Sequence, residues 1–213
     1  MEGSIKIRAV IFDLGGVLVR TEDRLPRDGL ARRLGMTYDE LSRLVFESES
    51  ARLATLGKKS TPQHWESVRL ELGISPGDFP DVRAGFWRGD ALDSHLVDYI
   101  RSLRPRLKTG LLSNAWDNLR RVVTDTWEIA DAFDDIVISA EVGISKPDPR
   151  IYELAVLRLG VLPREAVFVD DFPHNIEAAQ RVGLKGILFR NSDQVRQDLE
   201  GLLKETHSSP PAP

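Results

Sequence analysis

Residues 8–18 read RAVIFDLGGVL, and this stretch decides the fold. An apolar run ends there in Asp13, and Gly15 and Gly16 follow closely. A continuous apolar run is typical of a strand that is covered on both faces. Ligands of open α/β sheets bind outside the carboxyl ends of such strands, and glycines there bring backbone N–H groups close to an anion. Asp13 and Gly16 are therefore candidate site residues, although a plain turn with Asp13 as its cap explains the pattern equally well.

Similar apolar runs recur along the chain, with helical patterns between them. Alternation of strands and helices is typical of a parallel α/β sheet, which is the fold class we predict. The expected strands are 8–12, 109–112, 136–138, 166–169 and 186–189, and the expected helices are 94–103, 118–126, 150–159, 175–182 and 192–203.

Residues 21–90 show helical periodicity but no convincing buried strand. They follow the first strand directly, so a helical subdomain placed over the end of that strand is the simplest explanation. Residues 207–213 are polar and proline-rich, and they are predicted to be disordered. The expected core comprises 1–20 and 91–206. The expected helices of 21–90 are 30–34, 38–46 and 63–72, with breaks at Gly57, Pro62 and 75–78.

Composition excludes several classes of protein. The chain has 213 residues with a net charge of −4, which argues against nucleic-acid and membrane-surface partners. No run approaches the ~20 apolar residues of a membrane helix. The start lacks the pattern of a signal peptide, and we expect a cytoplasmic protein. Cysteine is absent, which excludes thiolate catalysis and cysteine-ligated metals.

Two further polar clusters follow apolar runs in the middle of the chain. Ser113 and Asn114 offer a hydroxyl and an amide that suit phosphate oxygens, although a helix cap is the simpler explanation. Lys146 precedes Pro147 and Pro149, which stiffen the backbone ahead of a helix. A rigidly presented ammonium suits charge neutralisation, although a lone lysine is more often a surface residue.

Asp170 and Asp171 end another apolar run, and Asn175 follows four residues later. Adjacent carboxylates repel each other and need a compensating charge. Magnesium typically takes one or two carboxylates together with waters and phosphate oxygens. The pair therefore predicts a magnesium site, because capping a turn requires only one acid.

The joint occurrence of the four polar clusters is more informative than any one of them. If the strands are parallel, all of them meet at one edge of one sheet. A carboxylate nucleophile, a hydroxyl–amide pair, an ammonium and an acid pair suffice for phosphoryl transfer, whose catalysis is mainly positioning and charge stabilisation.

In this order, the stretches FDLGGVL, LLSNAWD, GISKPDPRIY and FVDDFPHNIEAA resemble the four motifs of the haloacid dehalogenase superfamily. The residues of these motifs are most similar to those of the subgroup that contains the N-terminal phosphatase domain of soluble epoxide hydrolase and bacterial sugar-phosphate phosphatases. The resemblance implies a Rossmann-like parallel sheet core with an inserted helical cap subdomain at about 21–90. It also implies a hydrolase, chiefly a magnesium-dependent phosphatase of small phosphorylated metabolites.

The resemblance assigns catalytic roles to three residues. Asp13 attacks phosphorus and forms an aspartyl-phosphate, which water then hydrolyses. Ser113 hydrogen-bonds the transferring phosphoryl group, with Asn114 beside it, and Gly16 contributes to substrate binding. Lys146 neutralises charge between Asp13 and the phosphate.

The resemblance also assigns a magnesium site. Asp171 is the direct ligand, and Asp170 acts close by through water. Asp13 and the carbonyl of Gly15 complete the protein ligands, and Asn175 supports the acid pair by hydrogen bonding.

Gly15 departs from the family pattern, because most phosphatases of the superfamily carry there a second aspartate that acts as general acid and base. Such assistance is typically worth about 10²–10⁴-fold. Either the substrate has a good leaving group, such as an anomeric sugar phosphate or an acyl phosphate, or a cap residue such as His64 supplies the proton.

Two alternative functions stay open. A 2-haloacid dehalogenase also lacks the second aspartate, but it needs no metal and typically carries an aromatic residue at the place of Gly15. A catalytically weak metabolite-binding or regulatory protein is the other alternative. Aromatic residues of the cap, Trp65, Phe86 and Trp87, suit either a substrate pocket or core packing, and a homodimer through the cap helices is a further expectation.

Overall fold

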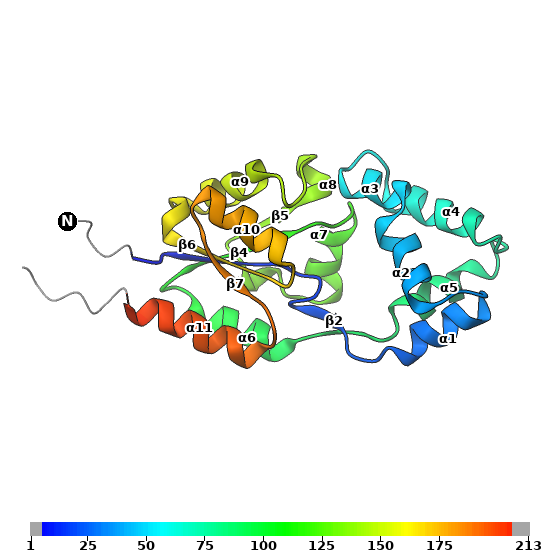
Figure 1. The fold of residues 1–213 in the computed structure, drawn as a ribbon, viewed down its shortest axis with the longest axis horizontal. Helices are drawn as coiled ribbons and strands as arrows, with labels where there is room; N and C mark the ends of the chain where they lie inside the picture. Colours follow the sequence, from blue (N-terminus) through cyan, green and yellow to red (C-terminus); the bar gives the residue numbers. More distant parts are fainter. Residues whose placement is uncertain (1–5, 206–213) are drawn as a thin grey trace, which may run out of the picture.

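The computed structural model describes residues 6–205, and its core is a five-stranded parallel sheet (Figure 1). The strand order is β5-β4-β1-β6-β7, so β1 lies in the centre and the chain builds outward on both sides of it. The predicted α/β class is confirmed, and each predicted core strand ends within one residue of an observed one. The strands are β1 (Ala9–Phe12), β4 (Lys108–Ser113), β5 (Asp135–Ile138), β6 (Ala166–Asp170) and β7 (Lys185–Leu188).

Helices cover both faces of this sheet (Figure 1). Buried residues of α6 and α11 pack on one face, and those of α9 and α10 pack on the other. Every residue of β1 and β6 is buried, which explains their uninterrupted apolar sequences. These elements are α6 (Ser94–Leu103), α7 (Leu119–Arg121), η1 (Val122–Thr126), η2 (Ala130–Ala132), α8 (Ser139–Val142), α9 (Pro149–Leu159), η3 (Pro163–Glu165), α10 (Pro173–Val182) and α11 (Ser192–Glu205).

Five helices lie between β1 and α6, and four of them, α1, α2, α4 and α5, contribute residues to a separate hydrophobic cluster that includes Leu30, Trp65 and Phe86. Pro62, expected to break the chain, lies in the first turn of α4, where a proline is tolerated. The division of the chain into a core and a cap with the stated boundaries stays a prediction. The helices are α1 (Leu25–Arg33), α2 (Tyr38–Glu47), α3 (Glu49–Thr55), α4 (Thr61–Glu71) and α5 (Phe79–Trp87).

A short antiparallel ribbon that the sequence did not predict connects these helices to the sheet. It consists of β2 (Val19–Thr21) and β3 (Asp90–Leu92), and Thr21 pairs directly with Asp90. The ribbon has three residues in each strand, and none of them is fully buried. It therefore has no apolar run from which a strand could be predicted.

A buried ion pair closes the ribbon at the helical end. Arg27 donates from Nη2 to both carboxylate oxygens of Asp90 at 2.9 Å, and its Nε donates to the carbonyl of Phe86 at 3.0 Å. The two charged side chains are 5% and 13% exposed. Removal of one partner from such a pair leaves the other charge buried and unpaired, so this contact holds α1 against the start of β3.

Residues 206–213, which include the segment predicted to be disordered, lie outside the described residues. Within residues 6–205, no helix combines the length and the apolar character needed to cross a bilayer.

Candidate active site

Lys146 joins two aspartates at the carboxyl edge of the sheet. Its Nζ lies 2.7 Å from Oδ1 of Asp13 and 2.7 Å from Oδ2 of Asp170. Phe12 pairs with Val169 in the sheet, so Asp13 and Asp170 extend from neighbouring strand ends. The three side chains are at most 8% exposed, which makes this a buried charge cluster.

Asn114 holds the backbone of Lys146 in place. Its Nδ2 donates to the carbonyl of Lys146 at 2.9 Å, and its Oδ1 accepts from the N–H of Lys146 at 2.8 Å. The loop after β4 is thereby fixed to the loop before α9. The structure thus gives Asn114 a positioning contact that the sequence did not suggest, and its binding of substrate stays a prediction.

Asn175 and the start of α10 fix Asp170. The Nδ2 of Asn175 donates to both carboxylate oxygens of Asp170 at 3.0 and 3.1 Å, and the N–H of Phe172 donates to Oδ1 at 2.8 Å. Tyr152 in turn donates from its hydroxyl to the carbonyl of Asn175. Each oxygen of Asp170 is therefore hydrogen-bonded, and the carboxylate has one orientation.

The cluster carries more negative than positive charge. Burial raises the pKa of Asp13 to about 7, because Lys146 lowers it less than burial and the charge of Asp170 raise it. Burial and the neighbouring Asp170 also raise the pKa of Asp171. One ammonium thus faces three carboxylates, so a cation added here relieves an existing electrostatic cost.

These residues fit a divalent metal ion. Asp13, Asp170 and Asp171 each offer a carboxylate oxygen, and the three oxygens lie within 4.8 Å of one another. Oδ1 of Asp171 is buried and has no hydrogen-bond partner among the described residues, and neither has Oδ1 of Asn175. A buried acceptor without a donor is costly, and coordination of a hard cation by oxygen removes that cost.

The two glycines after Asp13 have different surroundings. Gly16 has φ +79°, and a Cβ there would lie 2.2 Å from Oδ2 of Asp171. Gly15 is exposed, and a Cβ there would meet no atom within 4 Å. Gly16 is therefore required for the approach of Asp171, whereas a side chain at position 15 has open space.

Ser113 ends β4 and is buried, 4% exposed, at the same edge of the sheet. Leu111 pairs with Phe12, so the strand end that carries Ser113 lies beside the strand end that carries Asp13. The parallel sheet therefore brings all four polar clusters to one edge.

His64 does not lie among these residues. Its ring is fully buried, its Nδ1 is 3.0 Å from Oγ of Ser50, and its centroid is 4.4 Å from that of Trp116. Burial lowers the pKa of His64, so it is neutral at neutral pH. The expectation that His64 supplies the missing proton has no support in these contacts.

The loop after Ser113 also contacts the helical segment between β1 and α6. Asp117 accepts hydrogen bonds from the N–H and the hydroxyl of Thr61 at the start of α4. Trp116 packs against the hydrophobic cluster of the helices. The Asp117 contact could not be predicted from the sequence, because a single acid in a loop resembles any surface acid.

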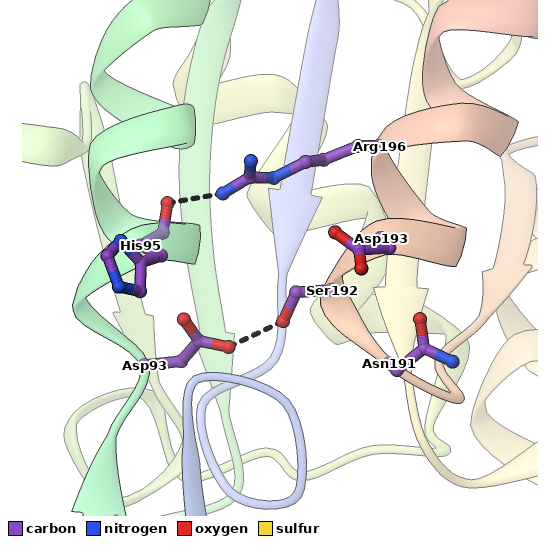
Figure 2. A pocket seen from close by; sticks show the side chains of 6 residues that line it. All are labelled: Asp93, His95, Asn191, Ser192, Asp193 and Arg196. Carbon is purple, nitrogen blue, oxygen red and sulfur yellow. Dashed lines mark hydrogen bonds between the residues drawn. The ribbon is translucent and has the colours of Figure 1, made fainter.

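A separate pocket lies between the starts of α6 and α11 (Figure 2) and contains none of these residues. Two of its side chains form hydrogen bonds between the helices: Ser192 donates to the carboxylate of Asp93, and Arg196 donates to the backbone carbonyl of His95. It reads as a contact between two helices. The pocket is lined by Asp93, His95, Asn191, Ser192, Asp193 and Arg196.

Comparison with known proteins identifies relatives over nearly the whole chain. A family model described as haloacid dehalogenase-like hydrolase matches residues 7–183. The chain is 38% identical to glyceraldehyde 3-phosphate phosphatase of Methanopyrus kandleri over 91% of this chain and 88% of that protein. It is 25% identical to bifunctional epoxide hydrolase 2 of Rattus norvegicus over 97% of this chain, but it spans only 41% of that protein's length.

A solved structure shares the fold. It is a haloacid dehalogenase family enzyme of Bacteroides thetaiotaomicron in complex with magnesium and inorganic phosphate, with a TM-score of 0.73 and 21% identity. The match covers 86% of this chain and 94% of that chain.

Gly16→Ala tests the close approach of Asp171. We expect a loss of at least about 1 kcal/mol in the free energy of unfolding, because the new Cβ meets the carboxylate and the backbone is left-handed there. Magnesium binding should weaken as Asp171 moves. Urea unfolding and calorimetric titration measure the two effects. Gly15→Ala is the matched control for unfolding, and an equal loss in both variants would contradict the steric argument.

Asp13→Asn tests the charge imbalance. A raised carboxyl pKa means that the stability contributed by the neutral form is complete below the unfolded value near 4 and is lost as pH rises through about 7. The variant should therefore unfold at a higher temperature than the parent at pH 8 in metal-free buffer, and the difference should shrink toward pH 5. A constant difference across this range, measured by thermal unfolding, would show that ionisation of Asp13 carries no penalty.

Proposed function

The chain belongs to the haloacid dehalogenase-like hydrolases, as its four motifs predict, and we propose that it is a magnesium-dependent phosphatase of small phosphorylated metabolites. One observation carries the proposal: Lys146 bridges Asp13 and Asp170 in a buried cluster that still has an excess of negative charge and an unpartnered oxygen on Asp171. Such a cluster suits a cation and a phosphoryl group together.

Asp13 is the proposed nucleophile, and its hydrogen bonds indicate which oxygen attacks. The N–H of Leu14 and the Nζ of Lys146 both lie 2.7 Å from Oδ1. Oδ2 is then the atom that forms the bond to phosphorus while the ester bond breaks and the leaving oxygen takes the electron pair. Water next attacks the aspartyl-phosphate and releases inorganic phosphate, which restores the carboxylate.

Lys146 favours the charged form of Asp13 and orients its Oδ1, and Asn114 keeps Lys146 in place. Ser113 is the proposed donor to the transferring phosphoryl group, with Gly16 and Asn114 beside it. Electrostatic stabilisation by preorganised groups needs such fixed positions.

Asp13, Asp171 and the carbonyl of Gly15 are the residues proposed to hold magnesium, with Asp170 close by and Asn175 supporting it. The ion supplies charge neutralisation for the phosphoryl oxygens. Asp170 is already fully hydrogen-bonded, which is consistent with a contact through water rather than a direct one.

The helical segment 21–90 is the proposed cap, which places the active site between it and the core formed by 1–20 and 91–206. The contact of Thr61 with Asp117 supports this arrangement, because it joins the segment to the loop that follows Ser113. The cytoplasmic location, the absence of nucleic-acid and membrane partners, and a homodimer stay predictions.

A phosphatase screen with and without magnesium tests the function. We expect release of phosphate from sugar phosphates, nucleotides or acyl phosphates that chelation of the metal abolishes. Asp13→Asn should lower kcat by at least about 10³-fold, because it removes the nucleophile. Halide release from 2-haloacids that is insensitive to a chelator would favour the dehalogenase alternative, and metabolite binding without turnover would favour the regulatory one.

Gly15→Asp tests the missing general acid. The open space at position 15 admits the side chain, and a proton donor there assists leaving groups that depart poorly as anions. We expect turnover of an alkyl phosphate to rise by up to about 10²-fold, with a much smaller change for acetyl phosphate. Unchanged alkyl phosphate turnover in a folded variant would show that the acid is not the limitation.

A further inference from the structure

Three partly exposed aromatic rings from distant parts of the chain meet where the loop after β4 contacts the helices of 21–90. Phe46 lies in the last turn of α2, Trp87 ends α5, and Trp116 lies in the loop after β4. The ring centroids are 5.6 Å apart for Phe46 and Trp87, and 6.3 Å apart for each of the other two pairs. We call this set the aromatic trio.

The trio is not simply the core of the helical segment. Trp65 and Phe86, which pack behind it, are 5% and 1% exposed, whereas Phe46 is 43% and Trp87 38% exposed. Of the aromatic residues expected to suit either a pocket or core packing, Trp65 and Phe86 are therefore packed in the core of the segment, whereas Trp87 is partly exposed. Exposed apolar surface that is contiguous rather than scattered marks a binding surface.

One short loop connects the trio to the candidate active site. Trp116 follows Ser113 by three residues, and Asn114 between them is bonded to the backbone of Lys146. Asp117 and Thr61 fix the same loop to the helical segment. A substrate whose phosphoryl group lies at Asp13 would extend its leaving group along this loop, and the trio is the apolar surface there.

The chemistry at position 15 constrains that leaving group. Gly15 carries no acid, and the buried ring of His64 packs on Ser50 and Trp116, so neither residue supplies a proton to the departing oxygen. A leaving group must then depart as a stable anion. The phenol group of tyrosine ionises at a pKa of about 10, whereas water ionises at about 15.7, so an aryl oxide leaves far more readily than an alkoxide.

We propose that the aromatic trio binds a planar aromatic leaving group, so that the substrates of this site are aryl phosphates. This rests on the proposed phosphatase function. The ring of the substrate packs against Phe46, Trp87 and Trp116 in stacked or edge-on geometry. The bond from Oδ2 of Asp13 to phosphorus forms, the bond from phosphorus to the aryl oxygen breaks, and the aryl oxide leaves with the electron pair and takes a proton from water.

Kinetics of ring variants test this proposal. The substrates are 1-naphthyl phosphate, acetyl phosphate and glucose 1-phosphate, and the last two have good leaving groups without an aromatic ring. Phe46→Leu and Trp87→Leu keep apolar bulk but remove the ring. We expect each to raise the ratio of the KM for 1-naphthyl phosphate to the KM for acetyl phosphate about tenfold, because one stacked ring contributes roughly that much to binding.

Leu70→Ala is the matched control. Leu70 is 63% exposed on α4 and belongs to none of the ring contacts, so the ratio should stay at the parent value. Binding of 1-naphthyl phosphate to Asp13→Asn in the presence of magnesium, measured by calorimetry, gives a second reading. Addition of Phe46→Leu to that protein should weaken binding by a similar factor.

The possible outcomes distinguish a failure of the aromatic leaving group from a failure of the proposed phosphatase function. Phosphate release with a KM ratio that neither ring variant changes overturns the aromatic leaving group and leaves the phosphatase intact. A larger effect of the ring variants on glucose 1-phosphate than on 1-naphthyl phosphate also overturns it, in favour of a sugar. Failure of folded parent protein to release phosphate from any of the three substrates overturns the proposed function itself.

Discussion

The ammonium of Lys146 is the charge on which the arrangement of the site depends. Two carboxylates that extend from neighbouring strands, at 8% exposure or less, would repel each other without it. Lys146 lies 2.7 Å from each of them, so it fixes the distance between the end of β1 and the end of β6. Its own backbone is held by Asn114, which connects the end of β4 to the same point. Three strand ends thus converge on one residue, two through its side chain and one through its backbone.

The two adjacent acids, Asp170 and Asp171, have different hydrogen-bond partners. Asn175 and the N–H of Phe172 donate hydrogen bonds to the carboxylate oxygens of Asp170, so this side chain has a fixed orientation. Asp171 keeps a buried oxygen without a partner among the described residues, and Gly16 leaves the space that its carboxylate occupies. One acid of the pair is therefore immobilised by the protein, and the other is available to a cation.

Much of this was readable from the sequence, for a local reason. β1, β4 and β6 each contain an apolar run that stops at a polar group, so Asp13, Ser113 and Asp170 could be placed at strand ends without knowledge of the fold. Other features depend on contacts across the chain. The hold of Asn114 on Lys146 spans 32 residues, and the ribbon of β2 and β3 is too short and too exposed to form an apolar pattern. The burial of His64 could not be read from its neighbours in the sequence, because it depends on contacts with Ser50 and Trp116.

The pairing of Thr21 with Asp90 has a consequence beyond catalysis. The 68 residues between them leave the two-stranded ribbon and return to it at paired positions, about 5 Å apart as paired strands require. The long segment therefore joins two adjacent strands in the same way as a short hairpin loop does. Another module whose two ends lie equally close could replace it without disturbing a single core strand, so recognition can diversify in evolution while the reaction chemistry stays the same.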